Sequence, residues 1–432
     1  MATQVVAGSL SALRAASYRL GSASIAQLPH VAASVAQTLR SCRELLSQTP
    51  ASKQQADGEG GVVLHRLITQ IGTLLQARTS AERFAATVLI KAVVEAGGWH
   101  MLSKCKHWVT GLLQNLKRPD PSSTRSLIVV TLTRIFMLTW DYPTLVREIT
   151  TPSLPSFITI CCQSLQSGKS TLNEQHIILE ALATLLPKHP TIFRTHVVNI
   201  NRLLEPLFAQ PNAGEPANVT MQTHPASLKD AASRLNALLH QCEPKQGSAA
   251  SWERAFITLV QSAHHLADRV LIGTDEDWQP TAHVTSDKTG LRKMYDRLDF
   301  STHTSALYND SQALQDCIDR LASLVTTPTN AAVSMPVGVL VDLVTRLFAS
   351  TIASEFSAHG SAGSVRHTQY VSKEERDAVA SVLPDIHVRA MVLLIRVIDR
   401  YGHAMLASSQ VLLDQICWIL SLIHISEPTR PY

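Results

Sequence analysis

The sequence predicts an all-α protein with a HEAT- or armadillo-like α-solenoid fold, in which antiparallel helix pairs stack on one another. Hydrophobic residues make up 45% of the 432 residues and aromatic residues only 5%, a mixture that suits helix-on-helix packing better than a β-sandwich. Apolar residues recur at three- and four-residue steps along most of the chain. Helix pairs also return about every 40 residues, which is the spacing of such repeats.

The first 61 residues are expected to form N-terminal helices followed by a linker. Val31, Val35 and Leu39 mark a helix that stops before Pro50, and a polar, Gly-containing segment follows it over residues 48–61. No Asp or Glu precedes Glu44, a bias found in mitochondrial transit peptides. Because the helical pattern continues well beyond a usual presequence, we favour an ordinary first helix.

The best-patterned stretch begins with a capping signal. Thr79 and Glu82 have the spacing of a capping box, which predicts a helix start near Ser80. Two glycines at 97–98 are expected to end this helix, and the apolar stripe over 99–116 predicts its antiparallel partner. The same pattern predicts further helices at 62–75, 127–140, 142–149, 154–165, 172–186, 192–208, 228–239, 252–271, 307–324, 337–348 and 386–398.

Breaks in the pattern predict the domain organisation. The Pro-, Gly- and Asn-rich segment 210–225 is expected to be a linker between a first helical-repeat block, 62–209, and a second one, 226–420. The last residues, 421–432, read SLIHISEPTRPY and resemble a translated sequencing-adapter tail. We therefore expect this segment to be an artefact and exclude it from the fold.

Candidate chemistry is sparse, so we expect no enzyme, no metal and no cofactor. The seven cysteines contain no C-x-x-C pair, which a zinc site would favour. Gly168-Lys169-Ser170 ends like a phosphate loop, but the required upstream glycine position holds Gln163. The pattern favours a helix–helix turn there.

A proline-rich corner over 141–155 is the most specific local feature. Asp141 can cap a helix that has Pro143 in its first turn. Pro152 is expected to push the preceding residue into an extended conformation. The result is a sharp corner displaying Arg147, Glu148 and two threonines, which is either purely architectural or an interaction site. The candidate partner-binding residues are Tyr142, Arg147, Glu148, Thr151 and Pro152.

A modest basic group precedes this corner. Its members are Lys104, Lys106, Lys117, Arg118 and Arg125. The net charge of +4 is far from that of a dedicated nucleic-acid-binding domain. The group could contact RNA phosphates, or it could be the solvated side of an amphipathic helix.

Several segments resemble a known family. RFAATVLIKAVVEAGGWHMLSKCKHWVTGLLQNLKRP and TLTRIFMLTWDYPTLVREITTPSLPSFI, within 83–158, resemble the N-terminal domain of the Rix family of pre-rRNA-processing proteins, whose animal members are the proline-, glutamate- and leucine-rich proteins. MPVGVLVDLVTRLF (335–348) and LPDIHVRAMVLLIRVIDRYG (383–402) look like its later helical segments. The acidic C-terminal region and nuclear-localisation signal that family members tend to carry are missing, which indicates a C-terminally truncated chain.

The resemblance implies a non-catalytic scaffold of the nucleus, found in the nucleolus and nucleoplasm. It implies a WD40-propeller subunit and another helical-repeat subunit as partners, together with the pre-60S ribosomal particle, the midasin AAA ATPase and a homodimer. The implied role is removal of the second internal transcribed spacer. The alternative is another helical-repeat adaptor, such as a nuclear transport or assembly factor, and no membrane partner is expected.

Overall fold

The computed structural model describes residues 2–47, 59–208, 224–276, 278–279, 291, 300–350, 366–367, 372–410, 412–414 and 416–417. Its contacts divide the chain into two compact units, Met1–Leu203 and Leu204–Tyr432. The segments 210–223 of the expected linker and 421–432 of the expected artefactual tail lie outside the described residues. The domain boundaries proposed from the sequence stay predictions.

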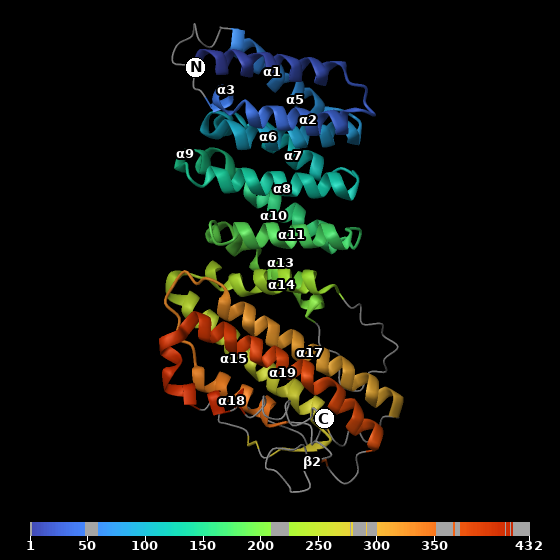
Figure 1. Cartoon of the computed structure of the whole chain (residues 1–432), viewed down its shortest axis with the longest axis vertical. Coiled ribbons are helices and arrows are strands. Elements are labelled where there is room, and N and C mark those ends of the chain that lie inside the picture. The colour runs from blue at the N-terminus through green and yellow to red at the C-terminus, as the bar shows by residue number, and fades with distance from the viewer. Residues whose placement is uncertain are drawn as a thin grey trace, which may run out of the picture. The chain divides into compact units, whose positions relative to one another are not determined.

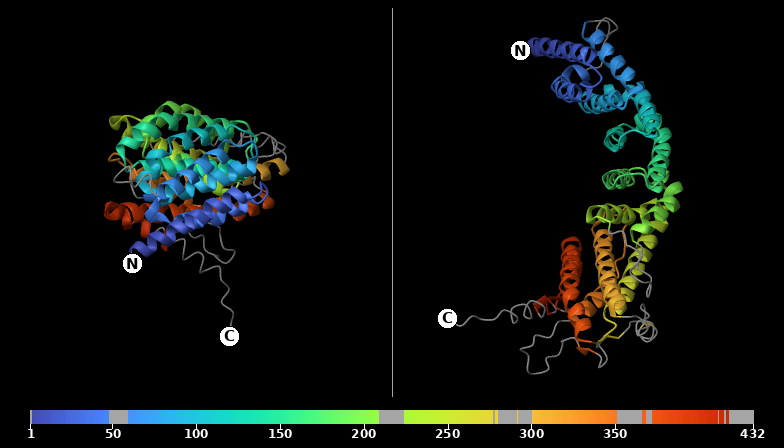
Figure 2. Two further views of the ribbon diagram at one scale, coloured as in Figure 1. Left: turned by 90° about the horizontal axis from the view of Figure 1, so that it is seen from above. Right: turned by 90° about the vertical axis from the view of Figure 1, so that its right-hand side faces the viewer.

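Unit 1 consists of helices stacked in two layers (Figures 1 and 2). One layer packs α2 (Leu28–Ser41), α6 (Ser80–Lys104), α8 (Ser122–Thr139) and α11 (Leu172–Leu185) in succession. The other layer packs in the order α1 (Ala2–Ser22), α5 (Glu59–Gln76), α7 (Lys106–Leu116), α10 (Thr151–Gln166) and α12 (Pro190–Phe193). This arrangement confirms the predicted all-α solenoid.

Shorter elements complete unit 1. They are α3 (Arg43–Ser47), α9 (Pro143–Leu145), the π-helical turn η1 (Val146–Thr150), the 3₁₀ turn η2 (Arg194–His196) and α13 (Val197–Leu204), whose last residue begins unit 2. Because each long helix touches neighbours on two sides, its apolar residues cover more than one stripe.

The predicted capping box at the start of α6 is confirmed. The Thr79 side chain accepts from the Glu82 N–H, and the Glu82 carboxylate accepts from the Thr79 N–H. Gly98 interrupts the helix with φ 53° and ψ −142°, a conformation open to glycine. The partner helix predicted over 99–116 is broken at Cys105, where α6 ends and α7 begins.

The corner at Pro152 differs from the prediction. Thr151 has helical dihedral angles, φ −56° and ψ −44°, instead of an extended conformation. Its N–H donates to the Val146 carbonyl, five residues back, which makes the preceding turn a π turn. A π turn is wider than an α turn, and this extra width accommodates the proline ring within a continuous path from α9 to α10.

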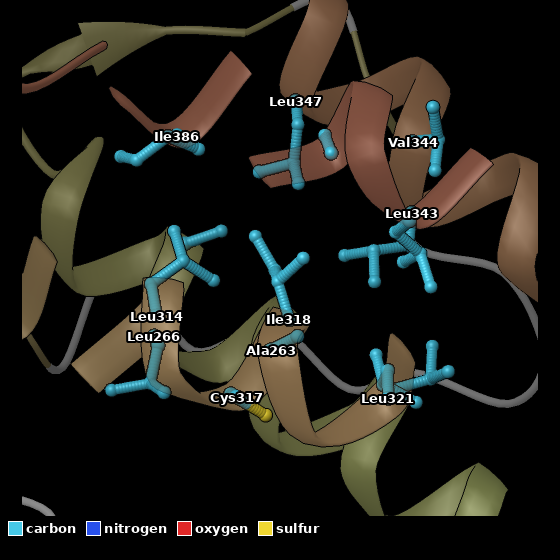
Figure 3. Packing of buried hydrophobic residues seen from close by; sticks show 14 of the residues in the cluster. Ala263, Leu266, Leu314, Cys317, Ile318, Leu321, Leu343, Val344, Leu347 and Ile386 are labelled. Atoms are coloured by element: carbon cyan, nitrogen blue, oxygen red, sulfur yellow. The ribbon is translucent and has the colours of Figure 1, made fainter. Parts of the chain in front are cut away.

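Unit 2 is a helical assembly around one apolar core. Its main helices are α14 (Ala226–Leu238), α15 (Lys245–Val270), α17 (Phe300–Thr326), α18 (Val337–Ala349) and α19 (Lys373–Tyr401). The 3₁₀ turns η3 (Glu205–Leu207), η4 (Leu239–Cys242) and η5 (Gly402–Ser408) flank them. Figure 3 shows Leu266 of α15, Ile318 of α17 and Leu343 of α18 converging in this core.

A buried charged cluster lies beside the apolar core of unit 2. Arg346 is fully buried, and its guanidinium donates to Asp268 at 2.5 Å and to Glu276 at 2.9 and 3.0 Å. The same guanidinium lies 4.1 Å from the centre of the Trp278 ring. These contacts tie the segment after α15 to α18.

Helix α19 is long and apolar enough to cross a membrane by length and composition alone. It packs against α17 and α18, and Leu383, Ile386 and Leu393 are buried in the core cluster. This is the arrangement of a core helix. Within the described residues, the only strands are the two-residue pair β1 (Thr274–Asp275) and β2 (Arg366–His367), which are antiparallel.

Candidate functional site

Two surfaces of unit 1 contain the residues singled out from the sequence. We name the first the corner ridge and define it as Tyr142, Arg147, Glu148, Thr151 and Pro152. Tyr142 is half-buried and the other four are exposed. The structure therefore brings all five to the surface around the π turn. Thr150, which the sequence also placed on display, is fully buried.

The corner ridge is anchored from beneath. Leu145 and Ile149 are buried, and the Thr150 hydroxyl lies 2.6 Å from the Thr139 hydroxyl at the end of α8. A buried hydrogen bond between two side chains holds a segment in one geometry because breaking it leaves unsatisfied polar atoms. The π turn is thus fixed to α8, and its exposed residues have defined positions.

Sequence reasoning missed Trp140 beside this ridge. Its side chain is 43% exposed, which is high for so large an apolar group. Lys188 lies over its ring at 5.4 Å from the centroid, and the His189 ring meets it edge-on at 5.1 Å. The corner after α8 is therefore linked to the corner after α11. Trp140 stands two residues from Tyr142, a signal that could have added it to the candidates.

The second surface is the basic group. Lys104, Lys106, Lys117 and Arg118 are exposed, at the end of α6, the start of α7 and the turn after α7. Lys104 Nζ lies 3.0 Å from His100 Nε2, and Arg118 Nη1 donates to the Ala77 carbonyl at 3.4 Å. Three of these cations, Lys104, Lys106 and Arg118, line one depression together with residues of α5.

Arg125 does not belong to that surface. Its guanidinium lies 2.5 Å from Glu174 Oε1 and donates to the Ser164 hydroxyl at 2.7 Å. The Glu174 side chain is only 2% exposed, so this pair joins α8 to α11 inside the repeat. The charge of Arg125 is already paired, which corrects its assignment as an RNA-facing residue.

A buried ion pair positions the walls of the basic surface. Arg83 of α6 donates through Nε to Asp120 Oδ2 at 2.8 Å and through Nη2 to Asp120 Oδ1. Its Nη1 donates to the carbonyls of Ala77 and Arg78, after α5. The hydrogen bond to Asp120 raises the pKa of the Arg83 guanidinium. One side chain therefore joins the ends of α5 and α7.

Six of the seven cysteines are buried, and Cys417 is exposed. Burial raises the pKa of Cys105 to about 12 and the pKa of Cys162 to about 11, and Cys317 likewise reaches about 11. A thiol with so high a pKa is a poor nucleophile because the thiolate is the reactive form. Across the described part of the chain, no group of three or more His, Cys, Asp or Glu residues could hold a metal ion.

A stack of helix layers with defined surface corners is the architecture of a helical-repeat protein. The family model for rRNA processing and ribosome biogenesis named RIX1 matches residues 12–214. The N-terminal region of the chain is therefore similar to the RIX1 family.

A solved structure supports the same fold over nearly the whole chain. It is a chain of "Rix1-Rea1 pre-60S particle - Rix1-subcomplex, body 3", which matches with a TM-score of 0.68 at 16% sequence identity. The match covers 94% of the present chain and 66% of the other one. The present chain thus spans about two thirds of the length of that relative. Both of its units fall within the matched fold.

Proposed function

We propose that this protein is a non-catalytic scaffold subunit of a Rix-type complex in the nuclear maturation of the large ribosomal subunit. In that role it supports processing of the second internal transcribed spacer and engagement of the midasin AAA ATPase. The observation that carries the proposal is the family match over residues 12–214. The fold likeness to a subunit of a pre-60S particle supports it.

The proposed partners follow from the same assignment. They are a WD40-propeller subunit, a second helical-repeat subunit, the pre-60S particle and a second copy of this chain. The proposed location is the nucleus, in the nucleolus and nucleoplasm, because precursor particles of the large subunit are assembled there.

We assign protein docking to the corner ridge. Arg147 and Glu148 present opposite charges side by side, and the exposed ring of Trp140 lies close in sequence to them. Aromatic and Arg side chains are enriched at the energetic centres of protein interfaces. The buried Thr139–Thr150 contact fixes the ridge before binding, which lowers the entropy lost on association.

Affinity purification of the full-length protein from its own cells tests the scaffold role. We expect precursor rRNA of the large subunit and a WD40 protein to co-purify. A purification that yields neither would overturn the proposal.

A charge swap tests the corner ridge. In Arg147→Glu/Glu148→Arg, the net charge and folding are expected to stay unchanged while one protein partner is lost from the purification. The matched control is Arg43→Glu/Glu44→Arg, which swaps another exposed Arg-Glu pair in the same unit and should keep all partners. Equal recovery with both variants would remove the docking role from this ridge.

A further inference from the structure

A groove runs between α5 and α7 on the basic side of unit 1. It consists of two adjoining depressions of about 590 and about 560 Å³, which share Gly72, Gln76 and His107. The larger one is lined by Gly72, Leu75, Gln76, Lys104, Lys106, His107, Thr110, Gly111, Gln114, Asn115 and Arg118. The smaller one extends it along Ile68, Thr69 and Thr73 of α5. We call the combined feature the α5/α7 groove.

The α5/α7 groove carries positive charge without compensation. Lys104, Lys106 and Arg118 line it, and its lining contains no Asp or Glu. None of these three side chains forms an ion pair with a carboxylate of the described residues, in contrast to Arg83 and Arg125 nearby. A concave surface lined by one sign of charge concentrates its field and attracts an opposite charge.

The floor of the α5/α7 groove is built by two glycines. A Cβ at Gly111 would lie 2.6 Å from Leu75 Cδ2, so a side chain there would force Leu75 of α5 to shift. A Cβ at Gly72 would meet nothing within 4 Å. The missing side chain at Gly72 leaves the floor open, and it provides a position where the groove can be filled without disturbing the fold.

The walls of the α5/α7 groove are held by buried polar contacts. Asn115 Nδ2 donates to the Leu75 carbonyl at 2.8 Å, which fixes α7 against the end of α5. The Arg83–Asp120 pair fixes the next turn. The cations therefore sit on a defined frame, and binding requires ordering only of their side chains.

The lining chemistry favours a nucleic-acid backbone over other anions. Neutral donors, Gln76, Thr110 and Gln114, line the groove together with the cations, and both kinds of group are the usual contacts to phosphate oxygens. No Trp, Tyr or Phe lines the groove, so it offers no platform for extensive base stacking, and contacts there would be made to the backbone.

We propose that the α5/α7 groove binds the phosphodiester backbone of RNA without reading its sequence. This deepens the proposed function, because precursor rRNA is the RNA that a scaffold of this family would meet, and it rests on that function for the identity of the RNA. The binding itself is a property of the purified chain.

The test is fluorescence anisotropy with the purified full chain and a labelled single-stranded RNA of mixed sequence, over a series of salt concentrations. We expect Lys106→Glu/Arg118→Glu to weaken binding by roughly tenfold or more and to reduce the slope of log K against log salt by about 1.4, from about 0.7 per phosphate contact. The control Arg43→Glu/Lys169→Glu makes the same charge change at two exposed positions outside the groove and should bind much more tightly than the groove variant.

A filling variant separates shape from charge. Gly72→Phe should lower RNA affinity several-fold while the melting temperature stays at or above that of the wild type. Gly338→Phe, in α18, also places a side chain where a Cβ would meet nothing within 4 Å, and it should bind as the wild type does.

Two results would overturn the inference. They are equal RNA affinity of the groove variants and their controls, and the absence of any RNA binding by the wild-type chain. Preferential binding of poly-glutamate over RNA would assign the groove to an acidic protein segment instead and would also overturn it. None of these results bears on co-purification with precursor particles. The scaffold proposal is therefore tested independently of RNA binding by the groove.

Discussion

Removing Asp120 should destabilise unit 1 far more than any surface change. The Arg83 and Asp120 side chains are 6% and 3% exposed, and Asp120→Leu leaves the guanidinium buried without its carboxylate. Breaking a buried ion pair by removing one partner costs about 3–5 kcal/mol. For a unit of this length, each kcal/mol lowers the melting temperature by about 2–4 °C, so we expect a fall of roughly 6–20 °C.

The double variant Arg83→Met/Asp120→Leu provides the sharper part of this prediction. Replacing both charges by apolar groups of similar volume is often close to neutral, because the desolvation of the pair disappears together with its attraction. We therefore expect the double variant to melt above Asp120→Leu, with a coupling free energy of at least about 2 kcal/mol. The carbonyls of Ala77 and Arg78, which Arg83 also binds, lie on less buried residues and can turn to water.

Pulsed hydrogen–deuterium exchange during heating is the suitable assay, because peptides from 2–203 report unit 1 apart from unit 2. Glu44→Leu, an exposed acidic position in α3, is the matched control and should change stability by no more than about 0.5 kcal/mol. If Asp120→Leu melts within about 2 °C of Glu44→Leu, or if the double variant is the least stable of the set, the assignment of this pair as a structural anchor is wrong.

Three further outcomes follow from particular contacts. Burial, and next the nearby Arg346, lowers the pKa of His264 to about 4, below its unfolded value of 6.5. The stability that neutral His264 contributes to unit 2 is therefore complete above pH 6.5 and is lost as the pH falls toward 4. His264→Asn should flatten this pH dependence in urea unfolding. Gly72→Ala should stabilise α5 by about 0.5–1 kcal/mol, because a Cβ there meets nothing within 4 Å. Gly111→Val should instead cost about 1–3 kcal/mol, because its side chain would meet Leu75. The midpoints of urea unfolding compare the two variants directly. Thr150→Val should cost about 1 kcal/mol and increase exchange at the π turn, and unchanged exchange would contradict the anchoring role of its hydroxyl.

The sequence determined the fold class and many helix limits because these depend on short-range signals. The capping box at Thr79 and Glu82 is local, and α6 begins at the residue it predicts. The break at Gly98 follows from the freedom of glycine at positive φ. The apolar period of three and four residues similarly identified the helices that form the two layers of unit 1.

The misassigned positions depend on contacts between residues far apart in the chain. Arg125 reads as one more exposed cation beside Lys117 and Arg118, and only its pairing with Glu174 of α11 removes it from that group. Thr151 precedes a proline, yet the π turn lets it stay helical. In both cases tertiary packing overrides a local preference of the chain. Such packing joins residues far apart in the sequence, so a short stretch of sequence does not reveal it.

The α5/α7 groove required the structure because most of its lining comes from residues with no charge. The sequence located Lys104, Lys106 and Arg118, but these side chains become a concave site only where Gly72 and Gly111 remove the side chains between α5 and α7. The walls of the groove are also held by Arg83, which binds Asp120 and the Ala77 carbonyl. Arg83 was not among the basic residues singled out from the sequence, and its side chain is buried. A cationic residue can thus serve an RNA-binding surface in two ways, by facing the phosphate or by fixing the frame. Asp120→Leu should therefore weaken RNA binding only where unit 1 begins to open, whereas Lys106→Glu/Arg118→Glu should weaken it in the fully folded protein.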